Sequence, residues 1–328
     1  MSERGGRALG RSGVTLPRVG IGCLGFGTRV GQERVDAVVD TAIDAGVAFF
    51  DTADAYGFGA SEIALGRAAR GRREQVLIAT KFGMSMNGAN GPETARASRR
   101  YLRTALAASL RRLGTDYVDL YQLHTPDRVT PPAETLGAMS ELVEAGLVRA
   151  IGCSNLTAEE VAQADDLART GDWQRFVTAQ NEYSLYNRSA EEALLPTCQE
   201  RDIGVLPYFP LAYGLLSGAY AEGRPAAPGS RLAEFPRRLL RADWRLLERL
   251  TGFAADRGLP LPTVAIGYLT AQPAVASVIA GVSGPEQVLA NAGALDWTPS
   301  AADLRELASM PHVAASYTTF ATRQPPPT

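Results

Sequence analysis

The sequence predicts a (β/α)8 barrel, or TIM barrel, formed by one domain over residues 1–328, and three observations predict this fold class. Short runs rich in β-branched and aromatic residues alternate eight times with longer stretches of helical periodicity. The runs are apolar almost throughout, as expected for parallel strands that are buried on both faces. Eight strand–helix units fit between about residues 18 and 295, which is a normal length for this barrel.

Each short apolar run is an expected strand, and the stretches between the runs are expected helices. The first long stretch, QERVDAVVDTAIDAG, places Val35, Val39 and Ile43 on one face and ends at Gly46, as a helix with a C-terminal glycine would. The eight expected strands cover residues 18–22, 47–51, 76–81, 117–124, 148–155, 176–180, 203–208 and 275–281.

Three segments lie outside this alternation. The opening LGRSGVTLP (9–17) predicts a small β-hairpin that precedes the barrel. Residues 211–241, after the seventh strand, are rich in glycine and proline and show neither helical nor strand periodicity. A loop of this length in a compact domain is more often a lid or binding loop than a linker. The proline-rich tail, 311–328, is expected to fray.

The composition argues against several classes of protein. With a formal net charge of −2, no nucleic-acid or anionic membrane partner is expected. No apolar run approaches the ~18 residues of a membrane span, and the N-terminal residues lack the apolar stretch of a signal peptide. The three cysteines, Cys23, Cys153 and Cys198, and the two histidines predict a cytoplasmic protein without disulfides or a metal site.

One motif suggests a different fold. Gly20, Gly22 and Gly25 match the GxGxxG pattern of a dinucleotide-binding Rossmann fold, and Asp51 ends the next strand, where a ribose-binding acid would lie. That pattern requires a helix to begin at its third glycine. The helical periodicity here begins only near Gln32, so the Rossmann fold is the weaker alternative.

Four polar residues lie at or just after the ends of neighbouring expected strands. Asp51 ends the second strand and leads to Tyr56, Lys81 ends the third, and His124 ends the fourth. In a barrel these strand ends converge on one mouth, where active sites form. Each residue alone also has a structural explanation: Asp51 as a helix cap, Tyr56 as a loop anchor, His124 as a structural histidine. Their convergence favours a catalytic group.

The group is chemically suited to carbonyl reduction. Hydride transfer to a carbonyl builds negative charge on oxygen, and a proton must arrive as that charge develops. Tyrosine is a weak acid, but a nearby ammonium lowers its pKa. Lys81 is the one lysine in the chain, beside 32 arginines. A compact ammonium suits this task better than a broad, strongly basic guanidinium.

The motifs in this order resemble those of the aldo-keto reductase family. The strings that carry the resemblance are FFDTADAYG, IATKFG, SLRRLGTDYVDLYQLHTPD, IGCSN, QNEYSL, LPYFPLAYGLLSG and AGVSGPEQVLAN, over roughly residues 8–295. The resemblance implies reversible reduction of an aldehyde or ketone. Tyr56 would be the general acid, Lys81 would tune its pKa, Asp51 would hold Lys81, and His124 would orient the carbonyl.

The resemblance also implies a nicotinamide cofactor, expected to be NADPH, with NADH as the alternative. Many relatives carry a Lys or Arg near 281–287 for the 2′-phosphate, and this chain has none there. Arg231 is therefore the basic candidate, although it could equally be a solvated loop arginine. The expected cofactor-binding residues are Gly22, Cys23, Leu24, Asp51, Ser154, Asn155, Gln180, Tyr208, Phe209, Pro210, Leu211, Ser217, Arg231, Gly281, Ser283, Gln287 and Asn291.

The substrate is expected to be a small or aromatic aldehyde, or a hydroxylated or sugar-like ketone, bound at the barrel mouth. A rival interpretation is a nucleotide-sensing partner protein, like the β-subunits of Shaker-type channels, with little turnover. The residues expected to line the substrate site, which mix apolar and polar groups, are Tyr56, His124, Phe26, Phe58, Phe82, Thr125, Asp127, Arg128 and Tyr213.

Overall fold

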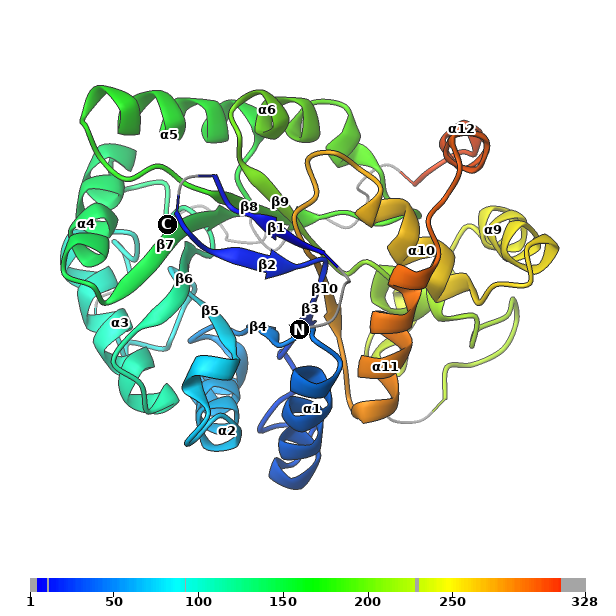
Figure 1. Cartoon of the computed structure of the whole chain (residues 1–328), viewed down its shortest axis with the longest axis horizontal. Helices are drawn as coiled ribbons and strands as arrows, with labels where there is room; N and C mark the ends of the chain where they lie inside the picture. The colour runs from blue at the N-terminus through cyan, green and yellow to red at the C-terminus, as the bar shows by residue number, and fades with distance from the viewer. Residues whose placement is uncertain (1–4, 11, 92, 228–229, 314–328) are drawn as a thin grey trace.

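The structure, a computed structural model, describes residues 5–10, 12–91, 93–227 and 230–313. Eight parallel strands form a closed barrel in the order β10-β3-β4-β5-β6-β7-β8-β9, with helices around it (Figure 1). The (β/α)8 prediction is confirmed. The barrel strands are β3 (Val19–Gly22), β4 (Phe49–Asp51), β5 (Leu77–Phe82), β6 (Val118–Leu123), β7 (Val148–Ser154), β8 (Thr178–Glu182), β9 (Gly204–Tyr208) and β10 (Val278–Gly281).

Helices cover the outside of the barrel, and five short 3-10 helices interrupt the loops of the described residues. The α-helices are α1 (Gln32–Asp44), α2 (Ala60–Ala68), α3 (Arg99–Leu113), α4 (Pro132–Glu144), α5 (Ala158–Thr170), α6 (Leu194–Glu200), α7 (Arg231–Glu234), α8 (Pro236–Leu240), α9 (Trp244–Asp256), α10 (Leu261–Thr270), α11 (Pro285–Gly293) and α12 (Ala301–Ser309). The 3-10 helices are η1 (Tyr56–Gly59), η2 (Arg73–Gln75), η3 (Ser189–Glu191), η4 (Ala212–Ser217) and η5 (Ala294–Asp296).

The predicted hairpin is present and closes one end of the barrel. Strands β1 (Gly6–Ala8) and β2 (Thr15–Pro17) pair antiparallel and cross the barrel opening in Figure 1. Leu16 in β2 and Leu9, which follows β1, are buried against barrel residues such as Phe49 and Leu120. The hairpin therefore covers the amino-terminal end of the barrel strands, opposite the end where the polar residues converge.

The alternation of side chains along each strand separates two layers of the core. In β4, Phe49 belongs to the inner cluster beneath the mouth, whereas Phe50 packs outward against the helices. In β5, Ala79 faces inward and Ile78 faces outward. This period of two puts every second strand residue inside the barrel, which decides which polar residues can reach the site.

The GxGxxG segment is part of the barrel and not of a Rossmann fold. Gly20 lies in β3, where an added Cβ would come within 2.6 Å of the Phe49 ring, so glycine leaves room for the inner core. No helix begins at Gly25, because α1 starts only at Gln32. The closed parallel barrel excludes the Rossmann alternative.

The long segment after β9 has more regular structure than the sequence predicted. Among the described residues of 211–241 there are three short helices, η4, α7 and α8. The α-helices contain only four and five residues, which is too short for a 3.6-residue periodicity to be visible in the sequence. The expectation of an irregular loop was wrong for these parts.

Candidate active site

The four predicted catalytic residues meet at the carboxyl end of the barrel. Asp51 ends β4, Lys81 lies near the end of β5, and His124 follows β6, while Tyr56 begins η1 in the loop after β4. The register aligns Asp51 with Ala79 and Lys81 with Gln122 across neighbouring strands. Parallel pairing thus brings residues that are far apart in sequence to one point.

Lys81 is the centre of this group. Its ammonium is fully buried and donates to Asp51 Oδ2 at 2.6 Å, to the Thr52 carbonyl oxygen at 2.9 Å and to the Tyr56 hydroxyl at 3.3 Å. A buried charge is tolerated only when it is paired and hydrogen-bonded, and three partners meet that requirement here. The contact with Tyr56 places a positive charge beside the phenolic oxygen.

The second oxygen of Asp51 is held by two glutamine amides. Gln180 donates to Asp51 Oδ1 at 2.8 Å, and Gln122 donates to the same oxygen at 3.3 Å. The sequence analysis named Gln180 as a cofactor residue but did not name Gln122. A polar residue near the carboxyl end of the buried strand β6 was the available signal. Together the amides fix the carboxylate that holds Lys81.

The pKa values of Tyr56 and Lys81 both lie above their ordinary values. Burial is the largest influence on the phenol and raises the pKa of Tyr56, although Lys81 acts in the opposite direction. Burial disfavours the ammonium, but Asp51 and Tyr56 outweigh it and raise the pKa of Lys81. The expectation of a net lowered tyrosine pKa was therefore wrong, because desolvation is stronger than the attraction of Lys81.

His124 is a neutral imidazole in this site. Burial, and next the Lys81 ammonium, hold the pKa of His124 well below its usual range. Its ring lies edge-on to Tyr56 with 5.7 Å between ring centroids, and its buried Nδ1 has no hydrogen-bond partner among the described residues. A neutral imidazole beside the phenol can donate one hydrogen bond to a substrate oxygen.

A cavity of about 260 Å³ opens above these residues. It includes three of the four catalytic candidates and ten of the predicted cofactor residues, together with Ala55, Met84 and Ile279, which the sequence analysis missed. Ala55 directly precedes Tyr56, and Met84 lies in the loop that follows Lys81 and the end of β5. The lining residues are Gly22, Cys23, Leu24, Asp51, Ala55, Tyr56, Met84, His124, Ser154, Asn155, Gln180, Tyr208, Phe209, Ile279 and Gly281.

One wall of the cavity is built from hydrogen-bonded polar groups. Tyr208 donates to Asn155 Oδ1 at 2.8 Å, and Asn155 Nδ2 donates to the His124 carbonyl oxygen at 2.9 Å. Ser154 Oγ donates to the Gln180 carbonyl oxygen at 2.8 Å. Asn155 also has a left-handed backbone, with φ of 60°, a strained conformation that is often found at functional sites. This wall offers amides, a hydroxyl and an aromatic ring to a flat polar ligand.

Other predicted cofactor residues lie outside the lining of this cavity. Pro210, Leu211 and Ser217 lie farther along the loop after β9. Ser283 and Gln287 are joined at the start of α11, where the Ser283 N–H donates to Gln287 Oε1 at 2.6 Å, and Asn291 is buried later in that helix. The side chain of Arg231 lies outside the described part of the structure.

Of the predicted substrate residues, Tyr56 and His124 line the cavity and the others do not. Phe26 and Phe82 are fully buried in the outer core, and Phe82 stacks on Tyr121. Phe58 is 63% exposed. Tyr213 packs against Phe209, with 4.0 Å between ring centroids.

The three predicted residues after β6 are engaged elsewhere. Asp127 accepts hydrogen bonds from the backbone of Ala97 and Thr130, so it organises two loops. Arg128 pairs with Glu160 beside a separate cavity of about 230 Å³. Thr125 is buried and does not reach the active-site cavity.

Among the described residues, no helix combines the length and the apolar character that crossing a membrane requires. Within the same residues, no group of three His, Cys, Asp or Glu side chains is arranged to hold a metal ion.

Comparison with known proteins identifies the family. The sequence model of the Aldo/keto reductase family matches residues 18–310. The chain is 33% identical to a "Probable voltage-gated potassium channel subunit beta" of Oryza sativa subsp. japonica, over 89% of this chain and 91% of that protein. It is also 33% identical to the "NADH-specific methylglyoxal reductase" of Escherichia coli (strain K12), over 92% and 97% of the two chains.

Solved structures agree with the sequence comparison. The holo form of aldo-keto reductase AKR11C1 from Bacillus halodurans is similar to this chain with a TM-score of 0.77 and 30% identity, covering 96% of this chain and 99% of that one. The chain belongs to the aldo/keto reductase family. It is an oxidoreductase that acts on carbonyl groups with a nicotinamide cofactor.

Proposed function

We propose that this protein reduces an aldehyde or ketone to an alcohol, with NADPH as the hydride donor and Tyr56 as the proton donor. The observation that carries the proposal is the set of contacts around Lys81, which links the buried Asp51 carboxylate to the Tyr56 hydroxyl. This arrangement stabilises negative charge on the phenolic oxygen after the proton has left.

The cavity wall fits a nicotinamide group. Amide and hydroxyl groups of Ser154, Asn155 and Gln180 converge on the cavity, and the Tyr208 ring lies beside them. These side chains would hold the carboxamide and the ring. When bound, the cofactor supplies a hydride to the carbonyl carbon.

The chain's own residues control the proton. Tyr56 is protonated at neutral pH, as any tyrosine of ordinary or raised pKa is, so it can deliver its proton to the substrate oxygen. Neutral His124 donates a hydrogen bond that orients that oxygen. Lys81 remains charged and stabilises the phenolate that results, and a proton from solvent restores the phenol.

The substrate we propose is a small or aromatic aldehyde, with a sugar-like ketone as the alternative. The cavity is small and mainly apolar, and Met84 and Tyr56 both line it. A relative whose name specifies methylglyoxal supports a small carbonyl compound. A broad panel of carbonyl compounds, assayed with NADPH and with NADH, tests the proposal. Background rates with every compound would refute it.

A second candidate function is nucleotide sensing with little turnover. It is favoured by the relative whose name is a potassium channel β-subunit. The same panel separates the two functions when it is combined with fluorescence titration of the cofactor. Steady turnover supports the reductase, whereas tight cofactor binding without turnover supports the sensor.

The cofactor preference is tested at Arg231. We expect Arg231→Ala to weaken NADPH binding by roughly 1.5–3 kcal/mol, the range for hydrogen bonds to charged groups, and to leave NADH binding nearly unchanged. A guanidinium matches a 2′-phosphate well, and NADH lacks that group. Arg224→Ala, an exposed arginine earlier in the same loop, is the matched control. Equal losses of affinity for NADPH and NADH would show that Arg231 does not hold the 2′-phosphate.

The pH dependence follows from the raised pKa of Tyr56. An acid whose pKa is raised keeps its proton to higher pH, so the tyrosine limb of the kcat/KM profile should lie above the ordinary pKa of tyrosine, about 10. His124 is already neutral and should contribute no limb near pH 6.5. Measuring reduction from pH 6 to 11 with saturating cofactor tests both statements. A tyrosine limb below pH 9 would contradict the first.

We also propose that the protein works in the cytoplasm. All three cysteines, Cys23, Cys153 and Cys198, are buried and unpaired in the structure. Buried thiols without disulfides are typical of a reducing compartment. Fractionation of the native cells followed by immunodetection tests this location.

A further inference from the structure

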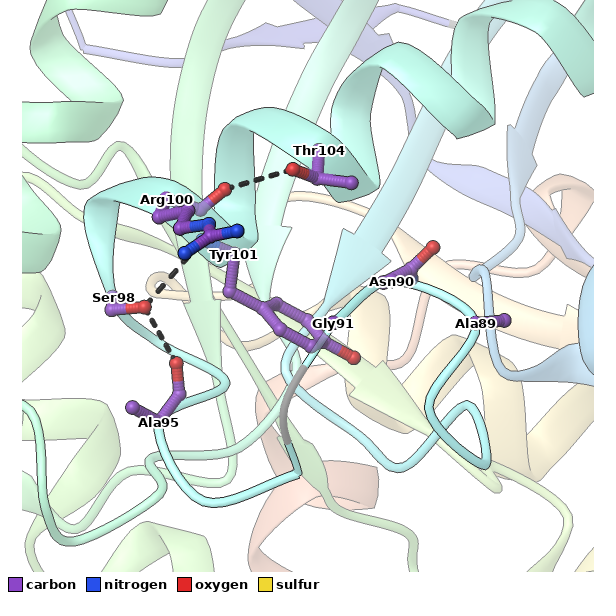
Figure 2. Close-up of a pocket in the computed structure, with 8 residues that line it drawn as sticks. All are labelled: Ala89, Asn90, Gly91, Ala95, Ser98, Arg100, Tyr101 and Thr104. Atoms are coloured by element: carbon purple, nitrogen blue, oxygen red, sulfur yellow. Dashed lines mark hydrogen bonds between the residues drawn. The ribbon is translucent and has the colours of Figure 1, made fainter.

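In the loop between β5 and α3, the described residues 84–91 and 93–98 border two cavities. Met84 at its start lines the active-site cavity next to Tyr56. Residues 89–91, in the middle of the loop, line a separate cavity of about 220 Å³ together with the first turns of α3 (Figure 2). The placement of this loop therefore helps to set the width of the active-site mouth.

A buried hydrogen bond joins this loop to the loop that carries Tyr56. Asn90 is only 3% exposed, and its Nδ2 donates to Asp54 Oδ2 at 3.0 Å. Asp54 is fully buried and lies two residues before Tyr56. Its backbone N–H contacts the Lys81 carbonyl oxygen at 3.3 Å. Asn90 is therefore hydrogen-bonded directly to the loop that carries Tyr56, the proposed proton donor.

Tyr101 extends this connection to the mouth. Figure 2 shows its ring reaching from α3 toward the segment 89–91, and an added Cβ on Gly91 would lie 3.8 Å from that ring. The Tyr101 hydroxyl donates to the Met84 carbonyl oxygen at 3.3 Å, and the side chains of Tyr101 and Asn90 line the same cavity. Asp54, Asn90, Tyr101 and Met84 therefore connect the two loops.

Asp54 makes this connection between the two loops sensitive to the loss of a hydrogen-bond partner. Its Oδ1 is buried and has no hydrogen-bond partner among the described residues. Burial, and next the carboxylate of Glu62, raise the pKa of Asp54 to about 8, although Arg112 and Lys81 oppose them. The carboxyl is therefore largely protonated at neutral pH. Removing Asn90 would leave a second oxygen of a buried carboxyl without its side-chain partner, which is costly.

We propose that Asp54, Asn90 and Tyr101 form a clasp that fixes the 84–98 loop against the tyrosine loop, and that Asn90 is a positioning residue that limits which carbonyl compounds reach Tyr56. The expected effect of the clasp on substrates rests on the proposed reductase function. It acts through Met84, because Tyr101 holds the backbone of that residue at the cavity edge. Neither Asn90 nor Tyr101 lines the active-site cavity, so neither touches the reacting atoms.

The test compares two aldehydes of different size, propanal and 4-nitrobenzaldehyde. We expect Asn90→Ala to raise KM for propanal by roughly tenfold, which corresponds to about 1.4 kcal/mol, because loss of the Asn90–Asp54 hydrogen bond releases the loop that helps to enclose a small substrate. We expect kcat and the Kd for NADPH to change by less than about twofold, because neither the proton donor nor the cofactor wall is altered. Selectivity should shift toward 4-nitrobenzaldehyde, since a released loop widens the mouth.

Three further measurements distinguish a positioning role from general destabilisation. Tyr101→Phe keeps the buried ring and removes the hydroxyl, so it should shift selectivity in the same direction even if Asn90→Ala fails to fold. Thr94→Ala, exposed in the same loop, is the matched control and should leave both aldehydes unaffected. Hydrogen exchange of residues 84–98 should accelerate in Asn90→Ala, and this readout does not depend on turnover.

The outcomes separate the clasp from the proposed function. If the wild type reduces no aldehyde but exchange of residues 84–98 accelerates in Asn90→Ala, the reductase proposal fails and the clasp stands as a structural connection. If both variants keep wild-type selectivity, or if the Kd for NADPH rises as much as KM, the positioning role is refuted. Unchanged exchange in Asn90→Ala would overturn the clasp itself.

Discussion

Tyr56→Phe is expected to lower kcat for carbonyl reduction by roughly 10²–10⁴-fold, the usual contribution of a general acid. The substitution removes one oxygen and keeps the ring. Lys81 retains Asp51 and the Thr52 carbonyl oxygen as hydrogen-bond partners, so its charge stays compensated. The site should therefore remain intact while its proton donor is lost.

Steady-state kinetics with a good aldehyde and fluorescence titration of NADPH together test this expectation. The Kd for the cofactor should stay close to the wild-type value, because the polar wall of the cavity lies on β7, β8 and β9. Tyr117→Phe is the matched control, since Tyr117 precedes β6 at the opposite end of the barrel and its ring lies between Arg73 and Arg149. If Tyr56→Phe keeps a tenth or more of wild-type turnover, the proton donor must be another group.

The convergence of the catalytic residues could be predicted because it depends on topology alone. Once parallel strands are expected, polar residues at successive strand ends must meet at one mouth. Asp51, Lys81 and His124 satisfy that rule, and the structure brings them together with Tyr56. No knowledge of side-chain packing was required.

The predicted substrate residues that do not line the cavity lie where side-chain direction decides the outcome. Phe82 follows Lys81 in β5, so the alternation of the strand turns it outward when Lys81 faces the site. It stacks on Tyr121 in the outer core. The period of two would have excluded Phe82 and would have favoured Gln122, which alternates with Tyr121 in β6 and reaches Asp51. Phe58 and Tyr213 lie in the short 3-10 helices η1 and η4 with positive φ angles, where no side-chain periodicity can be read from the sequence.

The pKa of Tyr56 could not be predicted from sequence because it is a balance of opposed effects. The sequence placed an ammonium near the phenol and so suggested a lower value. The structure adds the burial of the phenol, which is the larger influence. Burial also raises the pKa of the Asp54 carboxyl to about 8. The sequence did not single out this residue. Desolvation depends on the packing of the whole mouth and leaves little trace in local sequence.

Lys81→Arg is expected to lower kcat for carbonyl reduction by roughly 10²–10⁴-fold, although the positive charge is kept. The Lys81 side chain has no exposed surface, and its three partners lie within 3.3 Å of one nitrogen atom. A guanidinium is planar and broader, so it cannot occupy the same space and point at Asp51 and Tyr56 together. The chain uses arginine at all 32 of its other Lys or Arg positions, so charge alone does not explain this lysine.

The experiment measures kcat, the Kd for NADPH and thermal unfolding of Lys81→Arg beside a matched control. Arg73→Lys is that control, because Arg73 pairs with the buried Asp119 at 2.7 Å away from the active-site cavity. It should change stability by roughly 1–3 kcal/mol at most, as for a hydrogen bond to a charged group, and leave kcat unchanged. A Lys81→Arg protein that folds, binds NADPH and turns over at a near wild-type rate would show that any buried cation suffices. Tyr56 would then not depend on the compact ammonium that contacts its hydroxyl.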